Sequence, residues 1–127
     1  MSDFPKIAGI GIDACAIARM EAQLSKPHFL ERLFVKEELE YIQMKAIPAE
    51  SLAALYAAKE AALKAFGLGL GAIPFIDIVV SHDESGRPFY AMRGAALETL
   101  AGGKMHLSLT HEGGLAIAMA VLERSGA

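Results

Sequence analysis

The chain has 127 residues, a length that predicts a single domain over residues 1–127 with a sizeable core. Hydrophobic residues make up 54% of the sequence, which excludes a disordered protein. Twelve basic and fifteen acidic residues give a formal net charge of −3, and this balance argues against a general nucleic-acid binder.

Cys15 is the only cysteine, which excludes an internal disulfide framework and a zinc site built from several cysteines. A free cysteine most often serves as a small core residue, and it is compatible with a reducing compartment. The start of the sequence lacks the pattern of a signal peptide. No run approaches the roughly 20 apolar residues of a membrane span, so we expect a cytoplasmic protein without a membrane contact.

The first third of the chain is predicted to form one strand followed by helices. Residues 7–12 read as a short buried strand, and a helix is expected over 14–24 with Asp13 as its N-cap. After a break, the pattern predicts a short helical turn over 29–34 and a helix over 36–44.

An alanine-rich stretch predicts a long helix that starts at Ser51 and is stopped by Gly67. Its apolar side chains fall on one stripe at helical spacing: Leu52, Leu55, Leu63 and Phe66. Lys59 lies within the same stripe, although charged side chains are rarely buried unless they are paired. We therefore expect this wall of the helix to face a polar site.

The second half of the chain is predicted to consist mainly of antiparallel hairpins. Strands are expected over residues 75–81, 87–92, 105–110 and 115–122, with a short helix over 95–100. This order favours an α+β fold, in which an antiparallel sheet packs against the long helix, over a doubly wound parallel sheet.

The segment Gly9-Ile10-Gly11-Ile12-Asp13 places glycines in a strand, where they allow a partner or ligand to approach the backbone closely. With Ala14 it formally satisfies a dinucleotide-binding fingerprint. That fingerprint belongs to a parallel βαβ unit, which the rest of the sequence does not supply, so we set the interpretation aside.

Two carboxylates, Asp13 and Glu60, stand on different predicted elements at boundaries between polar and apolar residues. Mg2+ is commonly held by one or two carboxylates together with substrate phosphates and waters. Lys64 follows Glu60 by one turn, either as a helical ion pair or as a cation aimed at phosphate. These three residues are the candidate catalytic set, although Asp13 taken alone is more readily interpreted as a helix cap.

Glycines follow the long helix at Gly67, Gly69 and Gly71. They offer backbone amides and space for a bulky anion, while the alternative is an ordinary helix cap and turn. His111 ends a predicted strand after Ser108 and Thr110, and it is the one histidine in a context that suggests a site.

At this point the sequence resembles the holo-acyl-carrier-protein synthases, the short single-domain type of 4′-phosphopantetheinyl transferase. The similarity spans nearly the whole chain. Its markers are Gly9-Ile10-Gly11-Ile12-Asp13, Phe29-Leu30-Glu31-Arg32, Glu38-Leu39, Ala57-Ala58-Lys59-Glu60-Ala61, Lys64-Ala65-Phe66-Gly67, Gly86-Arg87-Pro88 and Ser108-Leu109-Thr110-His111. The resemblance implies transfer of 4′-phosphopantetheine from coenzyme A to a serine of apo-acyl carrier protein, with release of adenosine 3′,5′-bisphosphate.

The resemblance also assigns roles to residues. It implies that Asp13 and Glu60 hold Mg2+, that Lys64 contacts the phosphates of coenzyme A, and that His111 lies near the coenzyme A site. It implies that Arg19 helps to dock the acidic carrier protein. The family is usually a homotrimer with its active sites at the subunit interfaces.

A basic cluster in the first third of the chain is the expected docking surface for the carrier: Arg19, Lys26, Arg32 and Lys36. Arg19 and Lys26 stand at helical spacing, seven residues apart. The alternative is ordinary surface charge.

Three positions depart from the family pattern, namely Leu55 where many members have arginine, Tyr56 where they have Trp or Phe, and Val35 where they have threonine. Several points stay open. Glu60 or a water on the metal is the candidate base, and Lys59 is expected to line the coenzyme A pocket or to pair with a carboxylate at a subunit interface. The competing functions are a non-catalytic coenzyme A-binding module and a purely structural oligomer.

Overall fold

The computed structural model describes residues 4–125. Its helices are α1 (Ile17–Glu21), α2 (Pro27–Leu33), α3 (Lys36–Met44), α4 (Pro48–Phe66), the short 3-10 helix η1 (Phe75–Asp77) and α5 (Gly94–Leu100). Its strands are β1 (Pro5–Ala16), β2 (Ile78–His82), β3 (Pro88–Met92), β4 (Lys104–Glu112) and β5 (Leu115–Ser125).

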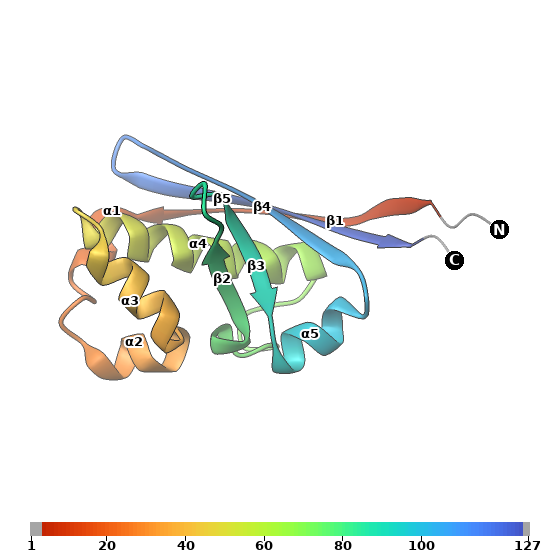
Figure 1. The fold of residues 1–127 in the computed structure, drawn as a ribbon, viewed down its shortest axis with the longest axis horizontal. Coiled ribbons are helices and arrows are strands. Elements are labelled where there is room, and N and C mark those ends of the chain that lie inside the picture. The colour runs from red at the N-terminus through yellow and green to blue at the C-terminus, as the bar shows by residue number, and fades with distance from the viewer. Residues whose placement is uncertain (1–3, 126–127) are drawn as a thin grey trace.

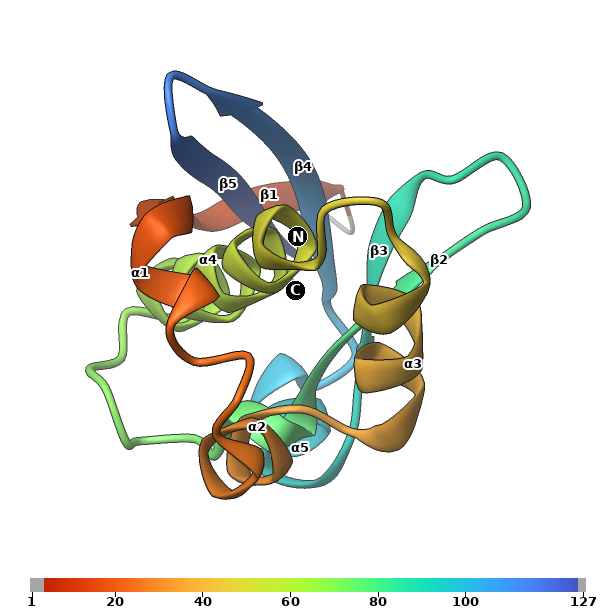
Figure 2. The same ribbon diagram turned by 90° about the vertical axis from the view of Figure 1, so that its left-hand side faces the viewer.

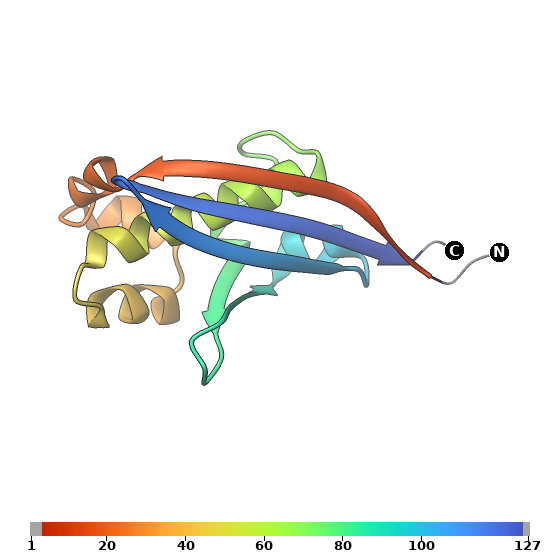
Figure 3. The same cartoon turned by 90° about the horizontal axis from the view of Figure 1, so that it is seen from above.

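The molecule is built around α4, which lies between a sheet and a second layer (Figures 1 and 2). The sheet has the order β1-β5-β4, and both pairings are antiparallel. Figure 3 shows its strands side by side above α4. The second layer, on the other side of α4, contains α3 and the antiparallel hairpin β2–β3. The predicted α+β class and both predicted hairpins are therefore confirmed.

The expected helix over residues 14–24 is wrong in its first part, because β1 continues through Asp13 to Ala16. Residues 13–16 pair with residues 115–118 of β5, so the ladder of the sheet outweighs the helix propensity of the two alanines. Helix α1 is short, and its N-cap is Ala16. Asp13 is thus a strand residue and not a helix cap.

The glycines of β1 allow α4, and not a ligand, to pack closely against the strand. A Cβ atom on Gly9 would lie 1.8 Å from the carbonyl oxygen of Ala65, and one on Gly11 would lie 1.9 Å from that of Ala61. Only glycine permits this approach, so the backbone of β1 rests directly on α4. Because every strand pairing in residues 4–125 is antiparallel, the dinucleotide fingerprint has no βαβ unit to support it.

The expected apolar stripe of α4 is buried as predicted, with Leu52, Leu55 and Leu63 at most 2% exposed. The helix starts at Pro48, earlier than the expected Ser51, because proline is well tolerated in a first helical turn. None of the helices in the part of the chain that the structure describes is long and apolar enough to cross a membrane.

Candidate functional site

The end of β1 meets the last turn of α4 through an ion pair. Asp13 follows Gly11 on the face of β1 that packs against α4. The ammonium of Lys64 donates to Asp13 Oδ1 at 3.1 Å and to the carbonyl oxygen of Ile12 at 2.9 Å. The Asp13 side chain is 12% exposed and that of Lys64 is 54% exposed, so the carboxylate is mostly covered while the cation stays accessible.

Glu60 lies one turn before Lys64 on α4 and is half-buried. Burial raises the pKa of the Glu60 carboxyl, and the nearby Asp13 carboxylate raises it further. The positive charges of Arg19 and Lys64 oppose this rise in pKa. The structure therefore brings the two predicted carboxylates close enough to repel each other, with two cations beside them.

This arrangement fits a hard divalent cation. Two half-buried carboxylates that repel each other are stabilised when a cation lies between them. Within residues 4–125, no group of three or more His, Cys, Asp or Glu side chains is arranged to hold a metal by itself. Mg2+ retains waters and takes substrate oxygens as ligands, so a pair of carboxylates is the kind of partial site that it uses.

Arg19 is held at the edge of this cluster by an aromatic ring. Its guanidinium carbon lies 5.4 Å from the ring centroid of Tyr56, which stands one turn before Glu60 on α4. Burial raises the pKa of the Tyr56 phenol, the charge of Glu60 adds to the rise, and Arg19 opposes it. Arg19 thus lies within the field of the carboxylate pair, close to the predicted reaction site.

The other three predicted docking residues lie farther along the chain. Lys26 is the N-cap of α2, Arg32 lies in the last turn of α2, Lys36 is the first residue of α3, and all three are exposed. Arg19 and Lys26 stand at helical spacing in the sequence, but α1 ends at Glu21 and the two residues belong to different elements.

The glycine loop starts at Gly67, three residues after Lys64. Gly67 adopts a left-handed conformation with φ +76° and donates its N–H to the carbonyl of Lys64 at 3.0 Å, so its amide serves the helix end. The cap alternative is therefore correct for Gly67. Gly69 and Gly71 are exposed, with open space where a Cβ atom would lie, so the rest of the loop has room for a bulky group.

His111 is not brought to the carboxylate pair within one chain. Its Nε2 lies 3.9 Å from Glu50 Oε1, in the first turn of α4. Glu50 precedes Glu60 by ten residues, which corresponds to about 15 Å along the helix axis.

Lys59 lines no open site, which corrects both expected roles. Its side chain is fully buried, and it pairs with Glu38 of the same chain at 2.9 Å. Burial lowers the pKa of Lys59 to about 8, and Glu38 opposes that fall. Sequence reasoning missed Glu38 as the partner. The buried lysine called for a carboxylate, but fifteen acidic residues were available and nothing local singled one out.

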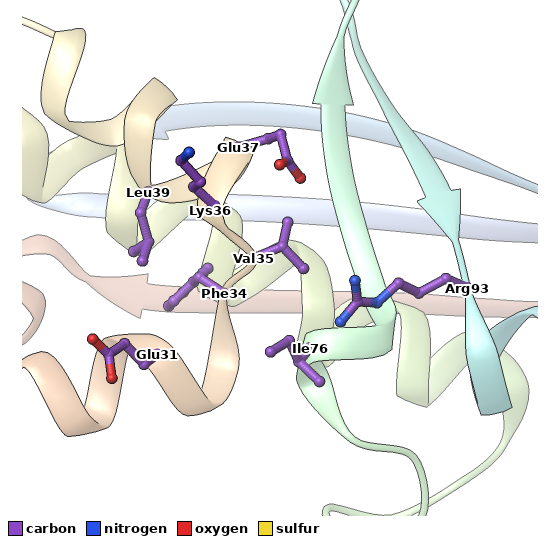
Figure 4. A pocket seen from close by; sticks show the side chains of 8 residues that line it. All are labelled: Glu31, Phe34, Val35, Lys36, Glu37, Leu39, Ile76 and Arg93. Atoms are coloured by element: carbon purple, nitrogen blue, oxygen red, sulfur yellow. The ribbon is translucent and has the colours of Figure 1, made fainter.

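A cavity of about 510 Å3 lies away from these residues, between α2, α3 and η1 (Figure 4). Its lining combines acidic, basic and apolar side chains: Glu31, Phe34, Val35, Lys36, Glu37, Leu39, Ile76 and Arg93. None of them belongs to the cluster of Asp13, Glu60 and Lys64. The candidate site is thus located by converging charges and not by this hollow.

Comparison with known proteins identifies the class. Residues 9–120 match the family model of the 4′-phosphopantetheinyl transferase superfamily, and the chain belongs to this family. It is 47% identical over 121 residues to the holo-[acyl-carrier-protein] synthase of Treponema denticola, covering 92% of this chain and 98% of the relative. It is 42% identical to the holo-[acyl-carrier-protein] synthase of Trichlorobacter lovleyi, with the same coverage of both chains.

Solved structures agree with this assignment. The holo-[acyl-carrier-protein] synthase of Helicobacter pylori in complex with coenzyme A superposes with a TM-score of 0.79 at 32% identity, covering 89% of this chain and 98% of that one. The Bacillus anthracis synthase in complex with coenzyme A (3′,5′-ADP) gives a TM-score of 0.79 at 34% identity, covering 94% and 98%. The family resemblance inferred from the sequence is therefore confirmed.

The raised pKa of Glu60 leads to a prediction about stability. Below the pKa of an unfolded glutamate, the carboxyl is neutral in both states, and as pH rises through the folded pKa its ionisation destabilises the folded state. Glu60→Gln should therefore raise the melting temperature at pH 7, and the gain should vanish below about pH 4.

Thermal unfolding of wild type, Glu60→Gln and Glu98→Gln at both pH values tests this expectation. Glu98 is exposed on α5, so its neutralisation should change the melting temperature little at either pH. A Glu60→Gln variant that is less stable than wild type at pH 7 contradicts the assigned repulsion.

Proposed function

We propose that the chain is a holo-[acyl-carrier-protein] synthase. A serine hydroxyl of apo-acyl carrier protein attacks the β-phosphorus of coenzyme A, so that a new O–P bond forms and the P–O bond to adenosine 3′,5′-bisphosphate breaks. The observation that carries the proposal is the meeting of Asp13, Glu60 and Lys64 where β1 reaches the end of α4. The names of the relatives support the same reaction. We place the protein in the cytoplasm, because its single free cysteine is compatible with a reducing compartment.

We assign the metal to Asp13 and Glu60. When bound there, Mg2+ would stabilise the negative charge that develops on the pyrophosphate and orient the leaving group. Lys64 now binds Asp13, and a bound pyrophosphate would offer its ammonium a second anionic partner. Because the Lys64 side chain is exposed, its ammonium can reach the pyrophosphate without movement of the helix.

The serine must lose a proton during the attack. We assign that proton to Glu60, because its half-buried carboxylate belongs to the cluster of Asp13, Glu60 and Lys64 to which the serine would be brought. The exposed residues Gly69 and Gly71 of the loop beyond Lys64 would accommodate the nucleotide end of coenzyme A.

Carrier docking is assigned to the exposed cations Arg19, Lys26 and Arg32 on α1 and α2. A carrier of this family is acidic, so these cations would steer its approach and place its serine near Glu60, beside Arg19. Such steering weakens as salt is added.

We further propose that the chain forms a homotrimer through the outer face of the sheet. The side chains of β1 and β5 that point away from α4 are apolar and exposed: Ile10 at 60%, Ile12 at 57%, Leu115 at 40% and Met119 at 43%. An exposed apolar face of this kind is typical of an interface. A neighbouring copy would also supply the His111 that one chain holds about 15 Å along α4 from its own Glu60.

A transfer assay tests the reaction. Apo-carrier protein incubated with coenzyme A and Mg2+ should gain one phosphopantetheine, about 340 Da by mass spectrometry. Asp13→Asn and Glu60→Gln should each lower the rate at least about a hundredfold, because each removes a metal ligand. Removal of Mg2+ with a chelator should have the same effect. Glu98→Gln, an exposed residue of α5 outside the cluster of Asp13, Glu60 and Lys64, is the matched control and should retain wild-type activity.

Full activity in either carboxylate variant would contradict the metal assignment. Coenzyme A binding that does not depend on Mg2+ or Glu60, without any transfer, would instead favour the non-catalytic binding module.

Mixing two inactive variants tests the shared site. His111→Ala and Glu60→Gln should each lose activity alone. When unfolded together and refolded, a trimer whose sites lie between copies should recover up to about a quarter of wild-type activity, because each site draws one residue from each of two copies. Sedimentation should give about three times the chain mass of 13.5 kDa. Recovery of no activity, or a monomeric mass, contradicts the shared site.

A further inference from the structure

On the face of α4 opposite the sheet, a fully buried ion pair connects the middle of the helix to the second layer. The ammonium of Lys59 lies 2.9 Å from Glu38 Oε1 and 2.9 Å from Glu38 Oε2, and both side chains are 0% exposed. The same ammonium donates to the carbonyl oxygens of Phe75 at 2.9 Å and Ile78 at 2.7 Å. It therefore ties α4 to both ends of η1.

Glu38 connects this ion pair to the start of α3 and to β2. Its Oε1 accepts a hydrogen bond from the N–H of Val35 at 2.9 Å, at the start of α3, where Val35 itself has no hydroxyl to cap the helix. Its Oε2 accepts from the N–H of Val80 in β2 at 2.9 Å. In addition, the hydroxyl of Tyr90 in β3 donates to the carbonyl of Ala58, next to Lys59.

On the sheet side, the long side chain that ties α4 to β1 is that of Lys64 in the last turn, which donates to Ile12 and Asp13. There the helix meets the bare backbone of Gly9 and Gly11 through Ala61 and Ala65, which lie about 200° and 240° around the helix from Lys59. A contact between glycine and alanine has no long side chain to interlock, so it resists rotation of the helix weakly. In the middle of α4, the side-chain hydrogen bonds that resist its rotation therefore come from Lys59 on the other face.

That setting matters because Glu60 directly follows Lys59. A rotation of about 20° would carry a side-chain atom that lies about 6 Å from the helix axis through about 2 Å. Misplacement of a reacting group by about 1 Å is enough to slow a reaction a hundredfold.

We infer that Lys59, Glu38 and Tyr90 are positioning residues that help to set the rotation of α4 and thereby keep Glu60 within electrostatic reach of Asp13. The inference rests on the proposed function only in treating Glu60 as a site residue. A buried ion pair alone is weak evidence for a stabilising role, because removing two charges from water costs about as much as their attraction returns. A role in placing Glu60 accounts for a charged pair at this position of the core.

The test compares Lys59→Met, the double variant Lys59→Met with Glu38→Gln, Tyr90→Phe and a control, Arg124→Met. Arg124 donates to the carbonyls of Leu100 and Thr99 at the end of α5. Its replacement therefore weakens the fold but leaves the hydrogen bonds of Lys59 and Glu38 intact. Three quantities are measured well below every melting temperature: the backbone amide NMR shifts of Glu60 and Lys64, the binding of Mg2+ by calorimetry, and kcat with KM for coenzyme A.

Lys59→Met leaves the charge of Glu38 buried without a cation beside it, so the melting temperature of this variant should fall steeply, while the double variant should recover most of the loss. In the double variant the Glu60 amide should still be displaced. Its Mg2+ affinity and kcat should fall at least about tenfold with KM changed less than about threefold, because only the carboxylate has moved. Tyr90→Phe, which preserves the shape of the side chain, should show a smaller change of the same kind. Arg124→Met should lower the melting temperature but leave the amide shifts, the Mg2+ affinity and kcat unchanged.

A double variant with the Glu60 amide shift, Mg2+ affinity and kcat of wild type would overturn the inference, as would equal losses in Arg124→Met. If the double variant does not fold, Tyr90→Phe decides, and unchanged amide shifts and kcat there would overturn it too. If wild type itself transfers no phosphopantetheine, the proposed function fails, while the amide shifts still report whether the pair positions Glu60.

Discussion

The contact of bare backbone in β1 with α4 is the constraint on which the rest of the structure depends. At Gly9 and Gly11 even a methyl group would fall within 2 Å of a helix carbonyl oxygen, so the strand lies as close to the helix as two backbones can. Two residues later the same face of β1 presents Asp13 to Lys64 and Glu60. The site is thus a consequence of how strand and helix pack.

The site that results is electrostatically costly in the free protein. Burial disfavours the charged form of Glu60, Asp13 adds to this effect, and Arg19 and Lys64 compensate only in part. Such an arrangement is expected where function and not stability sets the side chains. On the opposite face of α4, every buried polar group of Lys59 and Glu38 has a hydrogen-bond partner. The rigid packing around this pair holds α4 in place although Asp13 and Glu60 repel each other.

Local patterns in the sequence predicted much of this. The periodicity of residues 36–44 and the alternation of residues 105–110 depend on near neighbours, and the α+β class followed from them. The Asp13, Glu60 and Lys64 cluster also followed, through the family resemblance. The extension of β1 over Ala14 and Ala16 did not, because pairing with β5 overrode local propensity. The partner of Lys59 and the place of His111 depend on contacts distant in sequence or on a second copy, which no local pattern encodes.

The central claim is that packing of β1 on α4 makes one cation site from Asp13 and Glu60. Anomalous diffraction from crystals grown with Mn2+ and coenzyme A tests it most directly, since Mn2+ accepts the same oxygen ligands as Mg2+. The account predicts one Mn2+ per chain, bound by carboxylate oxygens of both Asp13 and Glu60 and by phosphate oxygens of the substrate. A cation bound elsewhere, or bound by only one of the two carboxylates, would contradict it.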